Sequence, residues 1–191
     1  MYEKINLDKE KFFDKIVLKG SDKMKNIILI GMPGAGKSTI GVILAKTLRM
    51  DFVDTDLIIQ NSENKKLIEI INDSGIDGFL KAENEVLKNI SLKNTVIATG
   101  GSAVYSKEGM DNLKQNGTTV YLYLEKNEIE KRIKNIKTRG IVMDKNQTLN
   151  ELFIERESLY KRYADLIVDC NSLTLEESVE KVIEYIKSKD V

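Results

Sequence analysis

Residues 31–39, Gly-Met-Pro-Gly-Ala-Gly-Lys-Ser-Thr, have the types and spacing needed to bind a phosphate group. They match the pattern G-x-x-x-x-G-K-[ST], in which successive backbone N–H groups wrap a phosphate. Glycines permit the positive φ angles and the close backbone approach that such a loop requires. Lys37 is placed to reach the terminal phosphates of a nucleotide, and the Ser38 hydroxyl is placed to ligate Mg²⁺.

Two carboxylates, Asp54 and Asp56, form the second group suited to chemistry. Asp54 ends the segment 51–54, which we expect to be a strand, and Asp56 follows it two residues later. Sheets of α/β proteins bind ligands at the carboxyl ends of their strands. Residues two apart in extended chain point the same way, so both carboxylates can face one site. One can hold Mg²⁺ through water, and the other can accept a proton from an attacking hydroxyl. The alternative is that both cap a helix beginning at Leu57, but the neighbouring phosphate loop favours the chemical role.

Two glycines and two arginines complete the candidate site. Gly100 and Gly101 follow an expected strand over 95–98 and allow a ligand to approach the backbone closely. Arg139 lies in a segment without clear periodicity, and Arg156 lies in the helix expected after it. Phosphoryl transfer depends on positioning and charge neutralisation, which suits Arg139 to closing over phosphates. Arg156 is suited to forking onto a carboxylate of the acceptor.

The elements that must position these residues alternate between strand and helix. Apolar, β-branched runs predict strands over 26–30, 51–54, 95–98, 118–124 and 166–168. Helical periodicity predicts helices over 37–48, 66–73, 78–90, 106–115, 127–137, 148–163 and 174–187. This alternation predicts right-handed βαβ crossovers and therefore an α/β fold, a three-layer sandwich with a five-stranded parallel sheet. Segment 137–147 joins two helices without a period of its own and has the profile of a lid.

Length and composition limit the class of protein. The 191 residues predict one domain, 24–191, preceded by a charged extension, 1–23, that we expect to be flexible. The 30 basic and 30 acidic residues balance, so we expect neither nucleic acid nor membrane as a partner. Without a membrane span or signal peptide, and with Cys170 as the single cysteine, we expect a cytoplasmic protein. The absence of histidine leaves carboxylates, lysines, arginines and hydroxyls for catalysis.

The order and spacing of these residues together resemble one family, the shikimate kinases. The resemblance extends from about residue 24 to the end of the chain. Its matching pieces are 31–39, 52–56, Phe79 with Glu83, 99–101, the lid Arg139, and 156–160. It implies a P-loop fold like that of the nucleoside monophosphate kinases. It also implies ATP-dependent phosphorylation of the 3-hydroxyl of shikimate, a step toward chorismate and the aromatic amino acids.

The resemblance further implies a role for individual residues. Lys37, Asp56 and Arg139 would be catalytic. Mg²⁺ would lie on Ser38 with Asp54 nearby. Asp56 would contact the acceptor hydroxyl, Gly101 the ring and Arg156 the carboxylate. ATP would lie on Gly34, Ala35, Gly36, Lys37, Ser38, Thr39 and Arg139. We expect a monomer.

Departures from the family pattern bear on the acceptor. Leu80 stands where the family has an arginine that clamps the shikimate carboxylate, and Ser102 replaces a third glycine. Gly140 and Ser158 replace prolines of the lid and of the arginine helix. Losing one partner of a buried charge pair costs ~2–5 kcal/mol of binding. Two alternatives therefore stay open: a kinase for another small hydroxy acid or polyol, such as gluconate, and a nucleotide-binding module without transfer activity.

Overall fold

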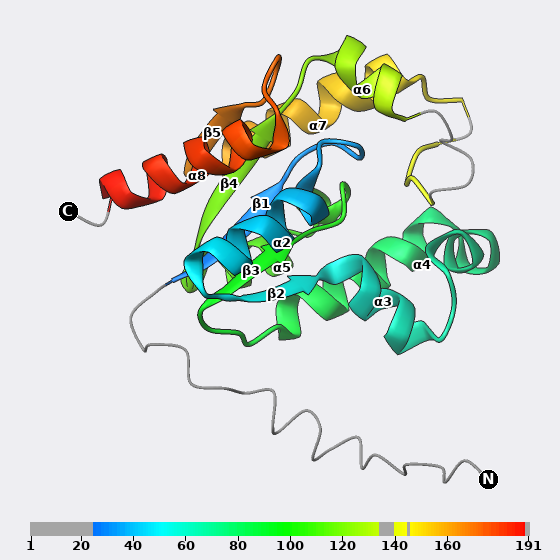
Figure 1. Cartoon of the computed structure of the whole chain (residues 1–191). Coiled ribbons are helices and arrows are strands. Elements are labelled where there is room, and N and C mark those ends of the chain that lie inside the picture. Colours follow the sequence, from blue (N-terminus) through cyan, green and yellow to red (C-terminus); the bar gives the residue numbers. More distant parts are fainter. Residues whose placement is uncertain (1–24, 134–139, 145, 190–191) are drawn as a thin grey trace, which may run out of the picture.

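A single five-stranded parallel sheet organises the computed structural model, which describes residues 25–133, 140–144 and 146–189 (Figure 1). The strand order is β2-β3-β1-β4-β5. The strands are β1 (Asn26–Ile30), β2 (Asp51–Asp54), β3 (Thr95–Ala98), β4 (Gly117–Tyr123) and β5 (Leu166–Asp169). The expected α/β fold is confirmed, and each strand begins and ends within one residue of its predicted bounds.

Helices cover both faces of the sheet (Figure 1). One face carries α2 (Lys37–Leu48) and α8 (Leu175–Lys189), which pack against each other. The other face carries α4 (Leu67–Asn89), α5 (Lys107–Gln115) and α7 (Leu149–Tyr163). The short elements are α3 (Thr55–Glu63), η1 (Ala103–Tyr105) and α6 (Lys126–Arg132). From β1 the chain crosses to β2 at one edge of the sheet, and from there each later strand lies nearer to the opposite edge. Because the crossovers are right-handed, this reversal of direction places α2 on one face of the sheet and α4, α5 and α7 on the other.

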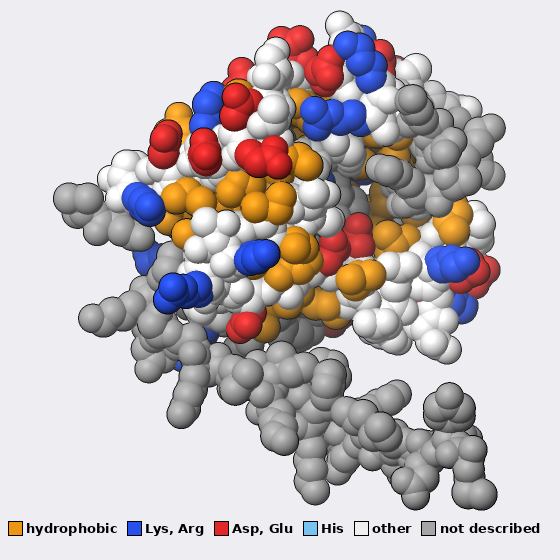
Figure 2. Space-filling model, viewed as in Figure 1, with side chains coloured by type: hydrophobic (Ala, Val, Ile, Leu, Met, Phe, Trp, Pro, Cys, Tyr) orange, Lys and Arg blue, Asp and Glu red, His pale blue; other side chains and the backbone are white. Residues whose placement is uncertain are grey.

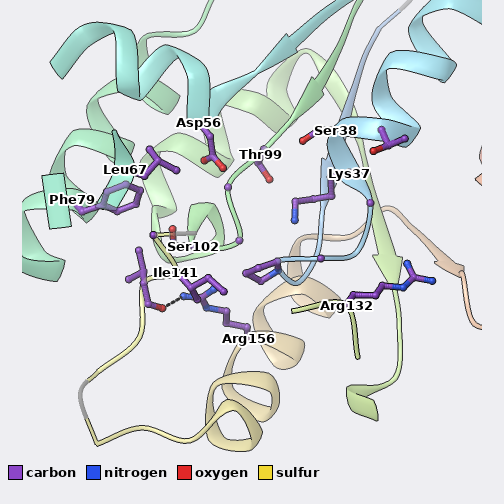
Figure 3. Close-up of a pocket in the computed structure, with 18 residues that line it drawn as sticks. Lys37, Ser38, Asp56, Leu67, Phe79, Thr99, Ser102, Arg132, Ile141 and Arg156 are labelled. Carbon is purple, nitrogen blue, oxygen red and sulfur yellow. Dashed lines mark hydrogen bonds between the residues drawn. The ribbon is translucent and has the colours of Figure 1, made fainter. Parts of the chain in front are cut away.

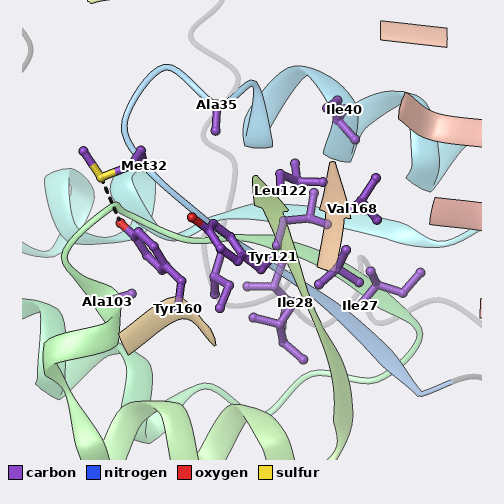
Figure 4. Close-up of a cluster of buried hydrophobic side chains, with 14 of the residues drawn as sticks. Ile27, Ile28, Met32, Ala35, Ile40, Ala103, Tyr121, Leu122, Tyr160 and Val168 are labelled. Atoms are coloured by element: carbon purple, nitrogen blue, oxygen red, sulfur yellow. Dashed lines mark hydrogen bonds between the residues drawn. The ribbon is translucent and has the colours of Figure 1, made fainter. Parts of the chain in front are cut away.

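The core lies between the two helical layers. All five residues of β1 are buried, because this central strand has helices on both faces. In β5, at the edge, buried and exposed residues alternate. Figure 4 shows the cluster in which Tyr121 of β4 and Tyr160 of α7 pack beneath the loop after β1. Their ring centroids are 5.0 Å apart. The loop after β1 therefore rests on a rigid apolar base.

The helices differ from prediction in three places. Helix α3 was not among the predicted helices and entered only as the alternative in which Asp54 and Asp56 cap a helix at Leu57; it begins at Thr55, with Asp54 as its cap, and its last four residues, 60–63, are all polar and obscure its periodicity. The predicted helices 66–73 and 78–90 are one element, α4, interrupted at Gly75, where φ is 70° and ψ is −179°. The predicted helix 127–137 is wrong in its extent, because α6 ends at Arg132 and residues 134–139 lie outside the described chain. Extension 1–23 also lies outside it.

Surface chemistry agrees with the balanced composition. Basic and acidic side chains share the face shown in Figure 2, and neither sign covers it alone. Among the helices that the structure describes, none has both the length and the apolarity to span a bilayer.

Candidate active site

The phosphate loop has the geometry that its sequence predicts. It leaves the carboxyl end of β1 and runs directly into the first turn of α2. Gly34 and Gly36 adopt φ values of +84° and +92°, a backbone conformation that is strained for any residue with a side chain. Gly36 precedes α2 and no side chain caps the helix, so its first N–H groups remain available to an anion. Gly34, Gly36, Lys37, Ser38 and Thr39 line a cavity of about 460 Å³.

Ala35 is the one phosphate-loop candidate that does not line this cavity. Its side chain is buried in the core under the loop (Figure 4). Only its backbone can therefore contribute to phosphate binding, which is the part that the loop motif requires.

Lys37 is buried at the base of the cavity. Its ammonium donates hydrogen bonds to the backbone carbonyls of Gly31 at 2.7 Å and Met32 at 2.9 Å. Burial lowers the pKa of Lys37 to about 8, while the neighbouring Asp56 opposes this change. A phosphate group bound in the loop would add negative charge beside the ammonium and favour its charged form.

Ser38 and Asp54 meet at the start of α2 and the end of β2. The Ser38 hydroxyl donates to Asp54 Oδ2 at 2.6 Å, and Asp54 Oδ1 accepts from the backbone N–H of Asp56 at 3.0 Å. Asp54 therefore caps α3 and also contacts the Ser38 hydroxyl that follows the phosphate loop, while its expected place beside Mg²⁺ stays a prediction. Two oxygen donors fit Mg²⁺, which takes few protein ligands and keeps water and phosphate oxygens. Among the described residues, no group of three or more acidic, cysteine or histidine side chains is arranged so that it could hold a metal ion by itself.

Asp56 reaches the cavity from a helix. The sequence analysis placed it in extended chain beside Asp54, whereas it occupies the first turn of α3. It still lines the cavity (Figure 3). Burial raises the pKa of Asp56 to about 6, Asp54 adds to the effect, and Lys37 opposes it. An acid of this strength is ionised at neutral pH yet basic enough to accept a proton.

Arg156 points into the other side of the cavity from α7, with 1% of its surface exposed. Its guanidinium donates to the Tyr105 hydroxyl at 3.2 Å and to the backbone carbonyl of Val142. It also lies over the Tyr105 ring, 5.2 Å from the centroid. This fixed fork is suited to a carboxylate.

The glycine turn after β3 is held against Arg156 and the phosphate loop. A Cβ on Gly101 would lie 2.8 Å from the Pro33 ring and 3.1 Å from a guanidinium nitrogen of Arg156. The Tyr160 hydroxyl donates to the Gly101 carbonyl at 2.6 Å and contacts the Met32 sulfur at 3.9 Å. The bulk of any side chain at position 101 would therefore disturb both halves of the site.

Part of the expected lid closes the cavity. Gly140, Ile141 and Val142 line it. Val142 is 6% exposed and packs on Phe79 in a small apolar cluster between α3 and α4. A Cβ on Gly140 would lie 2.9 Å from Leu67 Cβ, so a residue with a side chain at position 140 would clash with the start of α4. Arg139 lies outside the described residues, so its expected role stays a prediction.

Two further residues of the site carried no role in the sequence analysis. Arg132, at the end of α6, lines the cavity on the side away from Asp56 (Figure 3). A Cβ on Gly34 would lie 3.5 Å from Arg132 Cβ, so this arginine adjoins the phosphate loop. Glu83, on α4, is 1% exposed and adjoins Gly100. Glu83 follows Phe79 by four residues, which is about one helical turn, and this spacing could have predicted that both side chains lie on the same face of the helix.

Comparisons with known proteins agree with this geometry. A family model described as shikimate kinase matches residues 33–187. The shikimate kinase of Caldanaerobacter subterraneus is 39% identical over 170 residues, which is 87% of this chain and 99% of that protein. A shikimate kinase from Acinetobacter baumannii, solved in complex with shikimate, superposes with a TM-score of 0.82 at 32% identity. That match covers 89% of this chain and 97% of the other. Thymidylate kinase from Candida albicans, at 17% identity and a TM-score of 0.57, shares the fold.

Proposed function

The chain belongs to the shikimate kinase family, and we propose that it transfers the γ-phosphoryl group of ATP to the 3-hydroxyl of shikimate. One observation supports this most directly. A single cavity holds the phosphate loop, the carboxylate of Asp56 and the buried guanidinium of Arg156. A nucleotide and a small hydroxy acid can therefore lie end to end in it, with the reacting groups between them.

On the nucleotide side, the phosphate loop binds the β- and γ-phosphates through its backbone N–H groups and Lys37. Ser38 and Asp54 hold Mg²⁺, which supplies charge neutralisation for the phosphate oxygens. Arg132 adjoins this part of the cavity, and we assign it to the nucleotide as well. Arg139 closes over the phosphates in this proposal, as predicted from the sequence.

On the acceptor side, Arg156 forks onto the shikimate carboxylate and Gly101 contacts the ring. Asp56 accepts the proton of the 3-hydroxyl, whose oxygen then forms a bond to the γ-phosphorus. The bond from that phosphorus to the bridging β,γ-oxygen breaks, and ADP leaves. Lys37 balances the charge that builds up on the transferred group. The products are ADP and shikimate 3-phosphate.

The test is a coupled assay of ADP release with purified full-length protein. We expect release to require both Mg²⁺ and shikimate, and to be abolished in Asp56→Asn. Quinate and gluconate serve as acceptor controls, because Leu80 motivates a different hydroxy acid as the alternative acceptor. ADP release that is no faster with millimolar shikimate than without it would exclude the proposed function. Faster release with gluconate would favour the alternative kinase, and nucleotide binding without transfer to any acceptor would favour a binding module.

A further inference from the structure

Tyr105 lies against Arg156 and outside the cavity. The Nε–H of Arg156 donates to the Tyr105 hydroxyl at 3.2 Å, and the guanidinium carbon lies 5.2 Å from the centroid of the Tyr105 ring. A second nitrogen, Nη2, donates to the backbone carbonyl of Val142. Of the described residues, those that line the cavity include Arg156 and Val142 but not Tyr105. Any effect of Tyr105 on a ligand must therefore act through Arg156.

The third nitrogen of Arg156, Nη1, adjoins the glycine turn after β3. A Cβ on Gly101 would lie 3.1 Å from Nη1, and Gly101 lines the cavity. Because Nε and Nη2 donate to fixed acceptors, the guanidinium plane cannot rotate freely, and Nη1 stays beside this turn. A free arginine side chain samples many rotamers. Two fixed contacts therefore spare a ligand the entropy cost of ordering the guanidinium.

The orientation of Arg156 matters because it is the cation available to an acceptor carboxylate. Within the described chain, three basic residues line the cavity, and the other two are Lys37 and Arg132. Lys37 donates to two backbone carbonyls of the phosphate loop, and Arg132 adjoins the same loop at Gly34. Leu80 of α4 packs in an apolar cluster and supplies no charge. Binding of a carboxylate therefore depends on how well one guanidinium is oriented.

Packing alone does not require the hydroxyl of Tyr105. The side chain is half-buried where η1 meets α7, and a phenylalanine would keep the ring in this contact. Burial raises the pKa of Tyr105, Arg156 opposes this change and Glu155 adds to it. The phenol therefore stays neutral near pH 7, and its oxygen can accept from the guanidinium throughout the neutral range.

We propose that Tyr105 is a positioning residue for the acceptor, whose hydroxyl and ring hold the Arg156 guanidinium in the orientation that binds the acceptor carboxylate. This inference rests on the proposed function and deepens it, because it names the residue that orients the carboxylate-binding arginine. The hydroxyl fixes the rotation of the guanidinium through Nε, and the face of the ring stabilises the buried cation. This arrangement favours a small hydroxy acid with a free carboxylate as the acceptor.

The experiment removes the hydroxyl, keeps the ring, and measures steady-state kinetics together with the Kd of shikimate by titration calorimetry. In Tyr105→Phe the KM and Kd for shikimate should rise by roughly tenfold, because a hydrogen bond to a charged group is lost. The KM for ATP and the kcat at saturating shikimate should stay near their wild-type values. Tyr185→Phe is the matched control, because Tyr185 is 45% exposed on α8, which covers the other face of the sheet. It should leave all four quantities unchanged.

A double-mutant cycle with Arg156→Lys shows whether Tyr105 acts through the arginine. Lysine has no Nε–H donor of this geometry, so Tyr105→Phe should change the Kd of shikimate by less than about twofold in that background. A roughly tenfold rise that persists there, or an equal rise in the KM for ATP, would overturn the role of Tyr105. Turnover of shikimate with a KM that Tyr105→Phe leaves unchanged would overturn it too, while the proposed function would stand. Absence of both shikimate binding and turnover in wild type would overturn the proposed function, and the role of Tyr105 with it.

Discussion

Replacing Glu83 by glutamine should stabilise the folded protein without ligand, and the gain should depend on pH. The side chain is 1% exposed and has no hydrogen-bond partner among the described residues. Folding therefore either removes a charged carboxylate from water or requires it to take up a proton. Glutamine has nearly the same shape and does not ionise, so it escapes this cost.

The magnitude follows from proton linkage. Burial is the main cause that raises the pKa of Glu83 from 4.5 to about 7. Below pH 4.5 the group is protonated in the folded and unfolded states alike, and the free energy of unfolding does not change with its titration. Between pH 4.5 and pH 7 the unfolded chain releases a proton that the folded protein keeps, so stability falls as pH rises. The total loss is about 3 kcal/mol, and it is complete above about pH 7.

Urea unfolding followed by far-ultraviolet circular dichroism measures this difference. Wild type and Glu83→Gln should have similar free energies of unfolding at about pH 4.5, and the variant should be more stable by about 3 kcal/mol at about pH 8. Glu85→Gln, which removes only an exposed pair with Lys88, should change stability by less than ~1 kcal/mol without this trend. A constant difference between Glu83→Gln and wild type over this range would refute the burial of an unpartnered carboxyl group.

Three further predictions concern the phosphate loop and the turn that faces it. Lys37→Met should abolish phosphoryl transfer, because it removes the ammonium group that balances the charge of the γ-phosphate. The circular dichroism spectrum should stay unchanged, and transfer near the wild-type rate would contradict this role. Ser38→Ala removes the hydroxyl that meets Asp54 at 2.6 Å, so the Mg²⁺ concentration for half-maximal activity should rise by roughly tenfold, equivalent to ~1.4 kcal/mol. An unchanged Mg²⁺ requirement would exclude Ser38 as a ligand. Tyr160→Phe leaves the Gly101 carbonyl without its 2.6 Å donor and should destabilise the protein by ~1–3 kcal/mol in urea unfolding, with a raised KM for shikimate. A loss of stability with an unchanged KM would show that Tyr160 does not position the acceptor turn.

Local patterns in the sequence were sufficient for most of the fold. The strands contain short runs of apolar and β-branched residues, which favour extended chain. Burial is complete only in β1 and β3, at the middle of the sheet. The phosphate loop was predictable for a similar reason. Its glycines, Lys37 and Ser38 are contiguous, and the backbone conformation that binds phosphate is encoded in that one stretch. The helix α3 was not among the predicted helices because six of its nine residues are polar, and only Thr55 and Ile59 are buried by tertiary contacts.

The acceptor side of the site depended on contacts between distant parts of the chain. The sequence placed Asp56 near the phosphate loop, but only the fold shows that it acts from the first turn of a helix. Arg156 is 51 residues from Tyr105, and packing of α7 on η1 decides that its guanidinium turns inward.

The sequence by itself determined that this chain has a phosphate loop on a parallel sheet, because those features arise from contiguous residues and simple periodicity. Only the tertiary structure decided what happens to Glu83. Its burial, its closeness to Asp56 and its closeness to Gly100 come from three elements that meet in space: α4, α3 and the turn after β3. The charge state of a carboxyl group depends on those surroundings, and neighbours along the chain do not define them.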